Sequence, residues 1–181
     1  MLDEARTVAL VREGVKDAFD GIVEHYEAPL HRYLSRLTGD REAAKDLVQK
    51  TFIDAHRGIL NSTADLSLKA WLYRIATNNA LQLRRRRRLL EFIPFSRLGE
   101  AVTPRLRSPE ASPDEKLAVQ EALLKVPSEQ RTPMVLHFVE GFRYREIAEI
   151  IGISEEAVRK RVARGSQRFK AEYREETEGA L

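Results

Sequence analysis

A basic segment at residues 154–168 carries side chains of the types that bind nucleic acid. It begins with a serine and two glutamates and continues with five cations outside an apolar seam formed by Val158 and Val162. Arginine and lysine bind phosphate oxygens and guanine edges, and a carboxylate can accept a hydrogen bond from cytosine. We therefore predict duplex DNA contacts from this segment. The residues concerned are Ser154, Glu156, Arg159, Lys160, Arg161, Arg164 and Arg168.

The residues around this segment predict a helix-turn-helix. Residues 144–163 have the sequence YREIAEIIGISEEAVRKRVA. Ala148 is small enough for a second helix to approach closely, Gly152 stands where the turn needs a positive φ, and Ser154 suits the N-cap position. A run of cations alone is more typical of a solvated helix face with ion pairs four residues apart. The glycine, the alanine and the apolar spacing together favour DNA binding.

A second set of polar residues lines one side of a helix predicted over residues 66–90. Its members recur at i, i+4, i+8 and i+11, and they are Arg74, Asn78, Gln82 and Arg85. Amides can bond base edges, and arginine can bond phosphate or stack on bases. Trp71 and Tyr73 flank this face and could stack on unpaired bases, although core packing is the better interpretation of either ring alone. Five consecutive arginines at 84–88 repel one another, which is tolerable beside a polyanion.

The apolar spacing predicts an all-α fold with two small helical domains. Residues 41–57 carry an apolar stripe at the helical period, and no segment of the first half alternates in the manner of a strand. Residues 92–113 contain four prolines and no sustained period, which indicates a flexible linker rather than a long loop inside one domain. The linker would join a helical bundle at 1–91 to a four-helix domain at 114–181.

The helices of the second domain are predicted from turn signals as well as from periodicity. Pro127 ends a helix that begins at Asp114. Thr132 offers an N-cap before a proline at the first helical position, so the next helix is predicted to begin at Pro133 and to continue to Val139. Further helices are expected over 143–151 and 154–174.

The composition excludes several classes of protein. The 181 residues carry a net charge of +3 and include no cysteine, which excludes a disulfide scaffold, a thiolate zinc site and a cysteine nucleophile. The four histidines show no metal-ligand spacing, and there is no glycine-rich phosphate loop or nucleophile motif. We predict that the protein is not an enzyme and uses no metal or cofactor. Without a secretory signal or an apolar run of about 18 residues, we expect a cytoplasmic protein that does not insert into a membrane.

Four stretches, in this order, resemble the extracytoplasmic-function (group IV) sigma factors of bacterial RNA polymerase. They are LTGDREAAKDLVQKTFIDAHR at 37–57, WLYRIATNNALQLRRRRR at 71–88, LLKVPSEQRTPMVLHFVEGFRYREIAEIIGIS at 123–154 and EEAVRKRVARGSQRF at 155–169. The family's segments of this kind dock on the polymerase clamp, bind the minus-10 element and recognise the minus-35 element. The resemblance implies a sigma region 2-like bundle followed by a sigma region 4-like helix-turn-helix domain.

The resemblance also implies roles for individual residues. Asp46, Gln49 and Lys50, which face away from the apolar seam, would contact the β′ clamp coiled coil of the polymerase. In the family, a loop before the minus-10 helix captures a flipped base, which implies this role for Asn61 and Ser62. The minus-10 helix itself would contact the melted strand through Trp71, Arg74, Asn78, Gln82, Arg84 and Arg85. The implied partners are core RNA polymerase, through its β′ clamp coiled coil and β flap, promoter DNA and an anti-sigma protein.

These observations predict a promoter-specificity sigma factor for minus-10/minus-35 promoters. A sigma-like decoy that only binds an anti-sigma protein would not need the basic helix at 155–169 or the arginines at 84–88. An ordinary helix-turn-helix regulator would leave the polar face of the helix at 68–88 unexplained. The family often has glutamate where this chain has Lys50 and aspartate where it has Gln82, and these departures bear on the promoter sequence more than on the activity.

Overall fold

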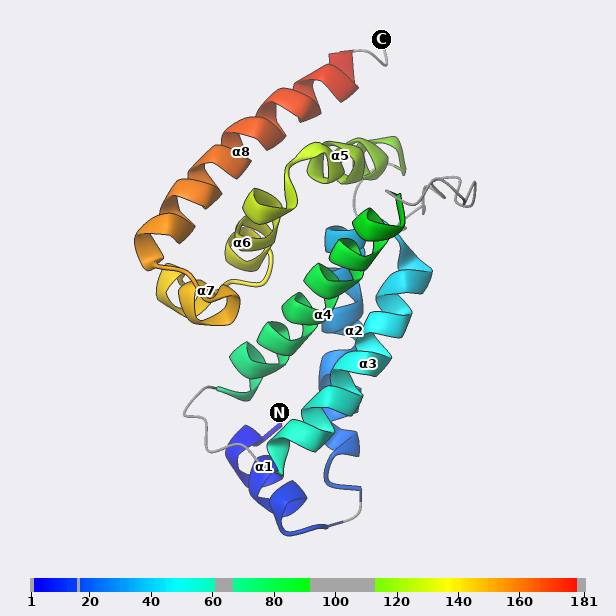
Figure 1. Cartoon of the computed structure of the whole chain (residues 1–181), viewed down its shortest axis with the longest axis vertical. Helices are drawn as coiled ribbons and strands as arrows, with labels where there is room; N and C mark the ends of the chain where they lie inside the picture. Colours follow the sequence, from blue (N-terminus) through cyan, green and yellow to red (C-terminus); the bar gives the residue numbers. More distant parts are fainter. Residues whose placement is uncertain (1, 16, 61–66, 92–112, 179–181) are drawn as a thin grey trace. The chain divides into compact units, whose positions relative to one another are not determined.

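The computed structural model describes residues 2–15, 17–60, 67–91 and 113–178 (Figure 1). These ranges contain helices and no β-strand, as the sequence predicts. The chain divides into two compact units, one containing α1, α3, α4 and most of α2, and the other containing α5 to α8 together with residues 35–41. The predicted all-α, two-domain architecture is therefore confirmed. The predicted linker falls almost entirely outside the described residues, so its exact boundaries stay a prediction.

The first unit is built from α1 (Glu4–Arg12), α2 (Asp20–Thr38), α3 (Arg41–Ile59) and α4 (Leu68–Glu91). Helices α2, α3 and α4 carry most of its buried side chains. The stripe predicted for α3 is buried at every position, namely Ala44, Leu47, Val48, Thr51, Phe52 and Ala55. Burial of these side chains fixes which face of α3 points outward.

A buried hydrogen bond and a buried ring contact fix the register of α4 on α2. Tyr33 of α2 and Thr77 of α4 are fully buried, and their hydroxyl oxygens lie 2.7 Å apart. The Tyr33 ring also lies 5.0 Å from the ring of Tyr73, measured between centroids. A buried hydroxyl needs a hydrogen-bond partner, so this pair favours one alignment of the two helices. That alignment decides which side chains of α4 face solvent.

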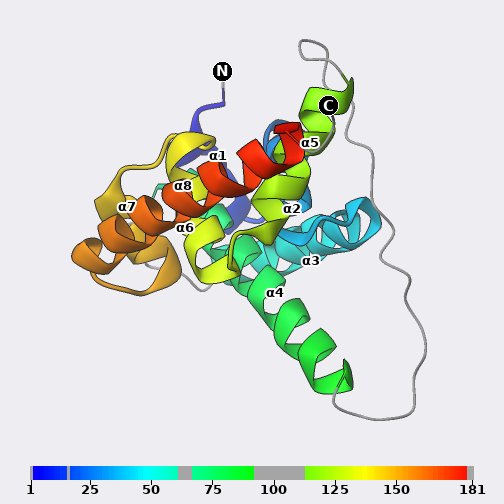
Figure 2. The same cartoon turned by 90° about the horizontal axis from the view of Figure 1, so that it is seen from above.

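The second unit contains α5 (Pro113–Lys125), α6 (Ser128–Phe138), α7 (Tyr144–Ile151) and α8 (Glu155–Glu178). Helix α8 packs mainly against α5 and α6 (Figures 1 and 2). An ideal Cβ placed at Gly165 of α8 would lie 3.1 Å from the carbonyl oxygen of Gln130 in α6. Glycine at this position therefore permits the close approach of the two backbones.

The predicted start of α6 is wrong. The helix begins at Ser128, directly after Pro127, and Pro133 lies inside it rather than at its first position. Pro127 has an extended backbone and precedes a serine and a glutamate, which suit the first turn of a helix. Pro133 forfeits a single backbone hydrogen bond, and the burial of residues 131–136 outweighs this loss.

Among the residues that the structure describes, no helix combines the length and the low charge needed to cross a lipid bilayer.

Candidate nucleic-acid and protein interfaces

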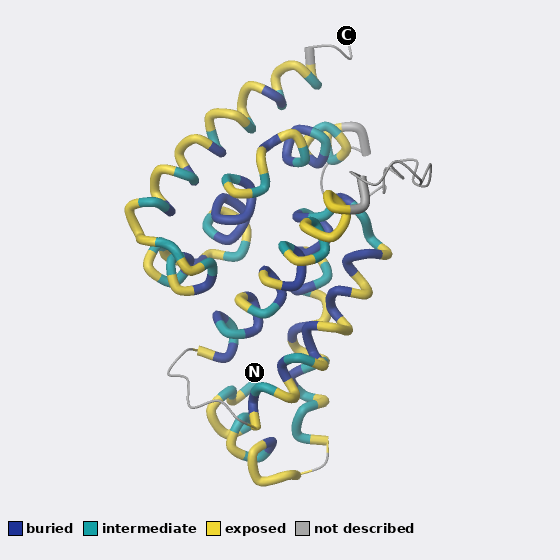
Figure 3. The backbone as a smooth tube through the Cα atoms, viewed as in Figure 1, coloured by how far each residue is buried: buried dark blue, intermediate teal, exposed yellow. Residues whose placement is uncertain are grey.

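The helix-turn-helix forms as the sequence predicts. Gly152 ends α7 in the left-handed conformation, with φ at 70°. The Ser154 hydroxyl accepts a hydrogen bond of 3.2 Å from the backbone N–H of Ala157, which caps α8. Val158 and Val162 are buried against the rest of the unit. This seam turns the opposite side of α8 toward solvent, and Figure 3 shows buried and exposed residues alternating along the helix.

The outward side of α8 carries the five predicted DNA-binding cations, which we call the recognition face. They are Arg159, Lys160, Arg161, Arg164 and Arg168, of which Arg161 is half-buried and the others are exposed. Glu156, also predicted to contact DNA, is exposed one turn before Lys160. The structure therefore places these cations and Glu156 together on one helix.

Three cations of the recognition face form ion pairs with glutamates four residues away. Glu155 Oε1 lies 2.8 Å from Arg159 Nη2, Glu156 Oε1 lies 2.6 Å from Lys160 Nζ, and Glu172 Oε1 lies 2.6 Å from Arg168 Nη2. The hydrogen bond from Arg159 to Glu155, and the charge of that carboxylate, raise the pKa of Arg159. Arg161 and Arg164 form no ion pair within the described part of the chain. The i,i+4 pairs considered as an alternative to DNA binding thus exist on the same helix.

Arg159 has a second contact that sequence analysis missed. Its Cζ atom lies 5.8 Å from the centroid of the Tyr144 ring, which is the distance of a cation–π contact. Tyr144 begins α7 and is half-buried. Its ring also lies 4.4 Å from the ring of His137, whose Nδ1 is 3.0 Å from the carbonyl oxygen of Phe142. The contact depends on how α7 crosses α8, so no spacing in the sequence indicates it.

The polar face predicted on α4 is exposed at all four positions, Arg74, Asn78, Gln82 and Arg85. We call this set the strand face. Tyr73, a candidate for base stacking, is fully buried, which confirms the core interpretation for that ring. Trp71 and Arg84 are half-buried. A Cβ added at Gly58 of α3 would lie only 2.9 Å from Cζ2 of Trp71, so this ring packs closely on α3.

Asn79, adjacent to the strand face, has an unrelated role. It is buried, and its amide nitrogen donates a 3.0 Å hydrogen bond to Asp54 Oδ2 of α3. The same oxygen lies 2.6 Å from Lys50 Nζ. Burial opposes ionisation of Asp54, but the hydrogen bonds from Lys50 and Asn79, together with the charges of Lys50 and Arg57, lower its pKa overall. This cluster joins α3 to α4.

The residues predicted to bind polymerase share the outer side of α3. Asp46, Gln49 and Lys50 are exposed, whereas Leu47 and Val48 are buried. We call the three exposed residues the docking face. The Lys50 ammonium is directed to Asp54, so this departure from the family pattern serves an ion pair within α3. Asn61 and Ser62, predicted to capture a flipped base, lie outside the described residues.

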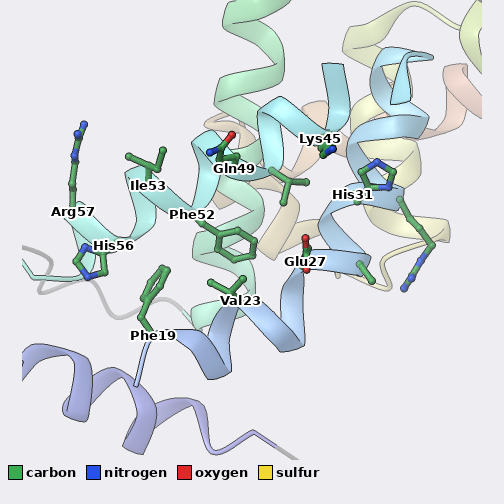
Figure 4. Close-up of a pocket in the computed structure, with 13 residues that line it drawn as sticks. Phe19, Val23, Glu27, His31, Lys45, Gln49, Phe52, Ile53, His56 and Arg57 are labelled. Atoms are coloured by element: carbon green, nitrogen blue, oxygen red, sulfur yellow. The ribbon is translucent and has the colours of Figure 1, made fainter. Parts of the chain in front are cut away.

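An open groove of about 980 Å³ adjoins the docking face, between α2 and α3 (Figure 4). Figure 4 shows Phe19, Val23 and Phe52 close together in it, and the rings of Phe19 and Phe52 meet edge to face at 6.3 Å. Gln49 of the docking face is among the lining residues. The charged lining residues are Glu27, Arg32, Lys45 and Arg57. An apolar floor with a mostly basic rim suits an amphipathic helix that carries acidic residues.

Comparison with known families agrees with this arrangement. A family described as sigma-70 region 2 matches residues 22–89, and one described as sigma-70 region 4 matches residues 116–169. The ECF RNA polymerase sigma factor SigM of Mycobacterium tuberculosis is 32% identical over 167 residues, which cover 92% of this chain and 82% of the relative. The chain belongs to the ECF family of RNA polymerase sigma factors. The predicted sigma factor is therefore confirmed. Members of this family are transcription initiation factors rather than enzymes.

Other relatives of this sigma factor extend the similarity along nearly the whole chain. SigW of Bacillus subtilis, also an ECF sigma factor, is 27% identical over 180 residues, covering 94% of this chain and 96% of the relative. Two solved structures share the fold. The sigma factor RpoE of Bartonella quintana, in complex with the anti-sigma factor NepR, superposes with a TM-score of 0.73 at 23% identity, over 87% of this chain and 98% of RpoE. CnrH, in complex with the cytosolic domain of CnrY, superposes with a TM-score of 0.70 at 24% identity, over 93% and 95%.

Proposed function

We propose that this sigma factor directs initiation at promoters with minus-10 and minus-35 elements by dividing the work among three surfaces. The docking face and the adjacent groove bind core RNA polymerase, the strand face holds the melted minus-10 strand, and the recognition face enters the major groove at the minus-35 element. The β flap of the polymerase is the partner proposed for the second unit.

The exposure of the recognition face supports its proposed contact with duplex DNA. A capped helix of a helix-turn-helix that presents arginines on its outer side fits the major groove. Arginine can pair with the O6 and N7 atoms of guanine, and lysine and arginine also neutralise phosphates. Replacing Arg159, Arg161 and Arg164 together by alanine should therefore weaken promoter binding.

The chemistry of the strand face supports a contact with unpaired bases. The amides of Asn78 and Gln82 and the guanidinium groups of Arg74 and Arg85 are exposed in one row. Amides bond base edges, and arginine stacks on bases or binds phosphate. Trp71 is only partly buried, so it retains an exposed part beside this row for stacking. We include Asn61, Ser62 and Arg84 in the same site.

The groove supports the proposal for the docking face. Its apolar floor would bury the apolar side of a polymerase helix, while Lys45 and Arg57 at its rim would pair with acidic residues of that helix. Asp46 and Lys50 stand at the same side of α3 and would add polar contacts. This arrangement fits one helix of the β′ clamp coiled coil.

One observation carries the proposal: a single chain presents exposed faces of DNA-binding chemistry in both its region 2 and its region 4. Transcription in vitro with core RNA polymerase and a promoter library tests it. We expect promoter-dependent transcripts that share two upstream elements. A chain that yields no transcript above core polymerase alone and binds no promoter DNA would be a decoy, and one that binds DNA but not polymerase would be an ordinary regulator.

We further propose that an anti-sigma protein regulates this chain in the cytoplasm. The similar structure of RpoE is a complex with the anti-sigma factor NepR, and that of CnrH is a complex with the cytosolic domain of CnrY. The groove, with its apolar floor and basic rim, is a surface that such a partner would cover. A partner isolated with the chain from its source cells should displace core polymerase in a reconstituted binding assay. Fractionation of those cells should recover the chain with cytoplasmic polymerase.

A further inference from the structure

Two side chains from different helices contact the guanidinium group of Arg159 at the same time. Glu155, one turn before it on α8, accepts a 2.8 Å hydrogen bond from Nη2. Tyr144, at the start of α7, presents its ring 5.8 Å from Cζ. Within the described part of the chain, none of the other recognition-face cations contacts an aromatic ring, so among them only Arg159 combines an ion pair with a ring contact.

The platform is itself anchored. Tyr144 is half-buried, and its ring packs 4.4 Å from that of His137 in α6. His137 Nδ1 in turn lies 3.0 Å from the carbonyl oxygen of the buried Phe142. The backbone N–H of Arg143, just before α7, donates a 2.7 Å hydrogen bond to Glu146 and so fixes the start of that helix. The ring therefore offers a fixed surface to a flexible side chain.

An exposed arginine normally samples many rotamers, and ordering it on DNA costs conformational entropy. Fixing its guanidinium plane before binding reduces this cost for one orientation only, because bidentate pairing with a base edge requires a defined plane. A phosphate contact constrains the guanidinium plane less, because the tetrahedral phosphate can be approached from many directions. Pre-orientation thus favours base recognition over general attraction to DNA.

We propose that Tyr144 and Glu155 are positioning residues that orient Arg159 to recognise one base pair of the minus-35 element. The inference rests on the proposed role of the recognition face. Glu155 has a second effect, because its carboxylate neutralises Arg159 and repels phosphates. It therefore lowers the affinity for DNA of any sequence while it raises the discrimination at one position.

The test uses holoenzyme reconstituted from the full chain and core polymerase, with a duplex promoter library whose upstream element is randomised. Arg159→Ala should reduce the binding ratio between the preferred base pair and the others at one position by roughly five-fold or more. Tyr144→Ala and Glu155→Ala should flatten the same position, and combining either with Arg159→Ala should add nothing. Tyr144→Phe keeps the ring and should keep the preference.

Binding to DNA that lacks the promoter supplies a second readout. Glu155→Ala should retain or increase this non-specific binding and steepen its salt dependence, while a merely structural defect would weaken all binding. Glu149→Ala is the matched control, because it removes an exposed carboxylate that pairs with Arg145 at 3.5 Å on α7, outside the recognition face. It should leave the base preference unchanged. Should Tyr144→Ala fail to fold, Glu155→Ala still decides the question.

The outcomes separate this inference from the proposed function. If Arg159→Ala removes the base preference at one position but Tyr144→Ala and Glu155→Ala keep it, only the positioning role is overturned. The positioning role is also overturned if those two variants lose binding equally to all sequences. It is overturned again if Tyr144→Phe loses as much base preference as Tyr144→Ala. If Arg159→Ala flattens no position, base recognition by Arg159 fails, and the inference fails with it.

Discussion

Helices α4 and α8 have the same length and the same number of basic residues, but they differ in how those residues are balanced. Each contains seven basic residues among its 24. Helix α8 also contains six acidic residues, and three of its cations are paired at i,i+4. Helix α4 has a single acidic residue, Glu91, at its last position.

This difference fits two kinds of nucleic-acid contact. Carboxylates beside the cations of α8 hold them in place and reduce attraction to phosphates, which suits discrimination between base pairs of a duplex. Helix α4, with its single acid at the last position, attracts any phosphate strongly, and its exposed amides then select unpaired bases. The two helices thus combine a selective contact with a strong one.

The largest expected effect concerns the strand face. Replacing Asn78 and Gln82 by alanine should lower promoter opening roughly tenfold or more, since each lost base contact costs about 1–3 kcal/mol. Polymerase binding should stay unchanged. Permanganate footprinting of the open complex beside a polymerase pull-down measures both. Replacing Asp46 and Gln49 by alanine is the matched control and should weaken polymerase binding first. Equal damage to both readouts by both pairs would indicate a general folding defect instead.

A smaller effect is expected for the arginine run of α4. Arg85, Arg86 and Arg88 are exposed, and replacing them by glutamine keeps their polarity but removes three charges. The slope of log affinity against log salt for single-stranded minus-10 DNA should become shallower by about 2, at roughly 0.7 for each lost phosphate contact. Removing the paired cations Arg159 and Lys160 should change that slope little. If the wild type and the glutamine variant have the same slope, these arginines do not contact the single-stranded DNA.

The smallest expected effect concerns the cluster that joins α3 to α4. Asp54→Asn should lower the free energy of unfolding by less than about 1 kcal/mol at neutral pH, because its ion pair with Lys50 is partly exposed. The folded state lowers the pKa of Asp54, so the charged carboxylate stabilises the fold above the ordinary aspartate pKa of about 3.9. The stability difference between wild type and variant should therefore shrink as the pH falls through and below that value. Urea unfolding at several pH values measures it.

Asp46→Asn is the matched control for this prediction. It removes an aspartate charge from the same helix, at a position without an ion pair in the described residues. Its stability difference from wild type should stay close to zero throughout. A pH dependence as large as that of Asp54→Asn would assign the effect to net charge rather than to the cluster.

Periodicity and turn chemistry were sufficient to predict most of the fold. The stripe of α3 is buried at every predicted position, and Gly152 adopts the positive φ that the turn requires. Such features are local, because they depend on residues within a few positions of one another. The start of α6 escaped prediction because two prolines compete as helix-start signals, and burial of residues 131–136 decides between them.

The candidate sites were predictable only in part, because several of their contacts join residues of separate helices. Asn78 and Asn79 are neighbours in the sequence, but one faces solvent and the other bonds to Asp54. The helical period separates the two, whereas the partner of Asn79 depends on how α4 packs on α3. The contact of Tyr144 with Arg159 and the groove beside the docking face likewise depend on the packing of separate helices.

Transcription from a template with a pre-melted minus-10 region and no minus-35 element tests the division of work most directly. On this template the recognition face has no element to bind, and the strand face meets its bases already unpaired. We predict that replacing Arg159, Arg161 and Arg164 by alanine leaves transcription at the wild-type level, while replacing Asn78 and Gln82 reduces it. Equal loss in both variants, or a loss confined to the arginine variant, would contradict separate strand and recognition faces.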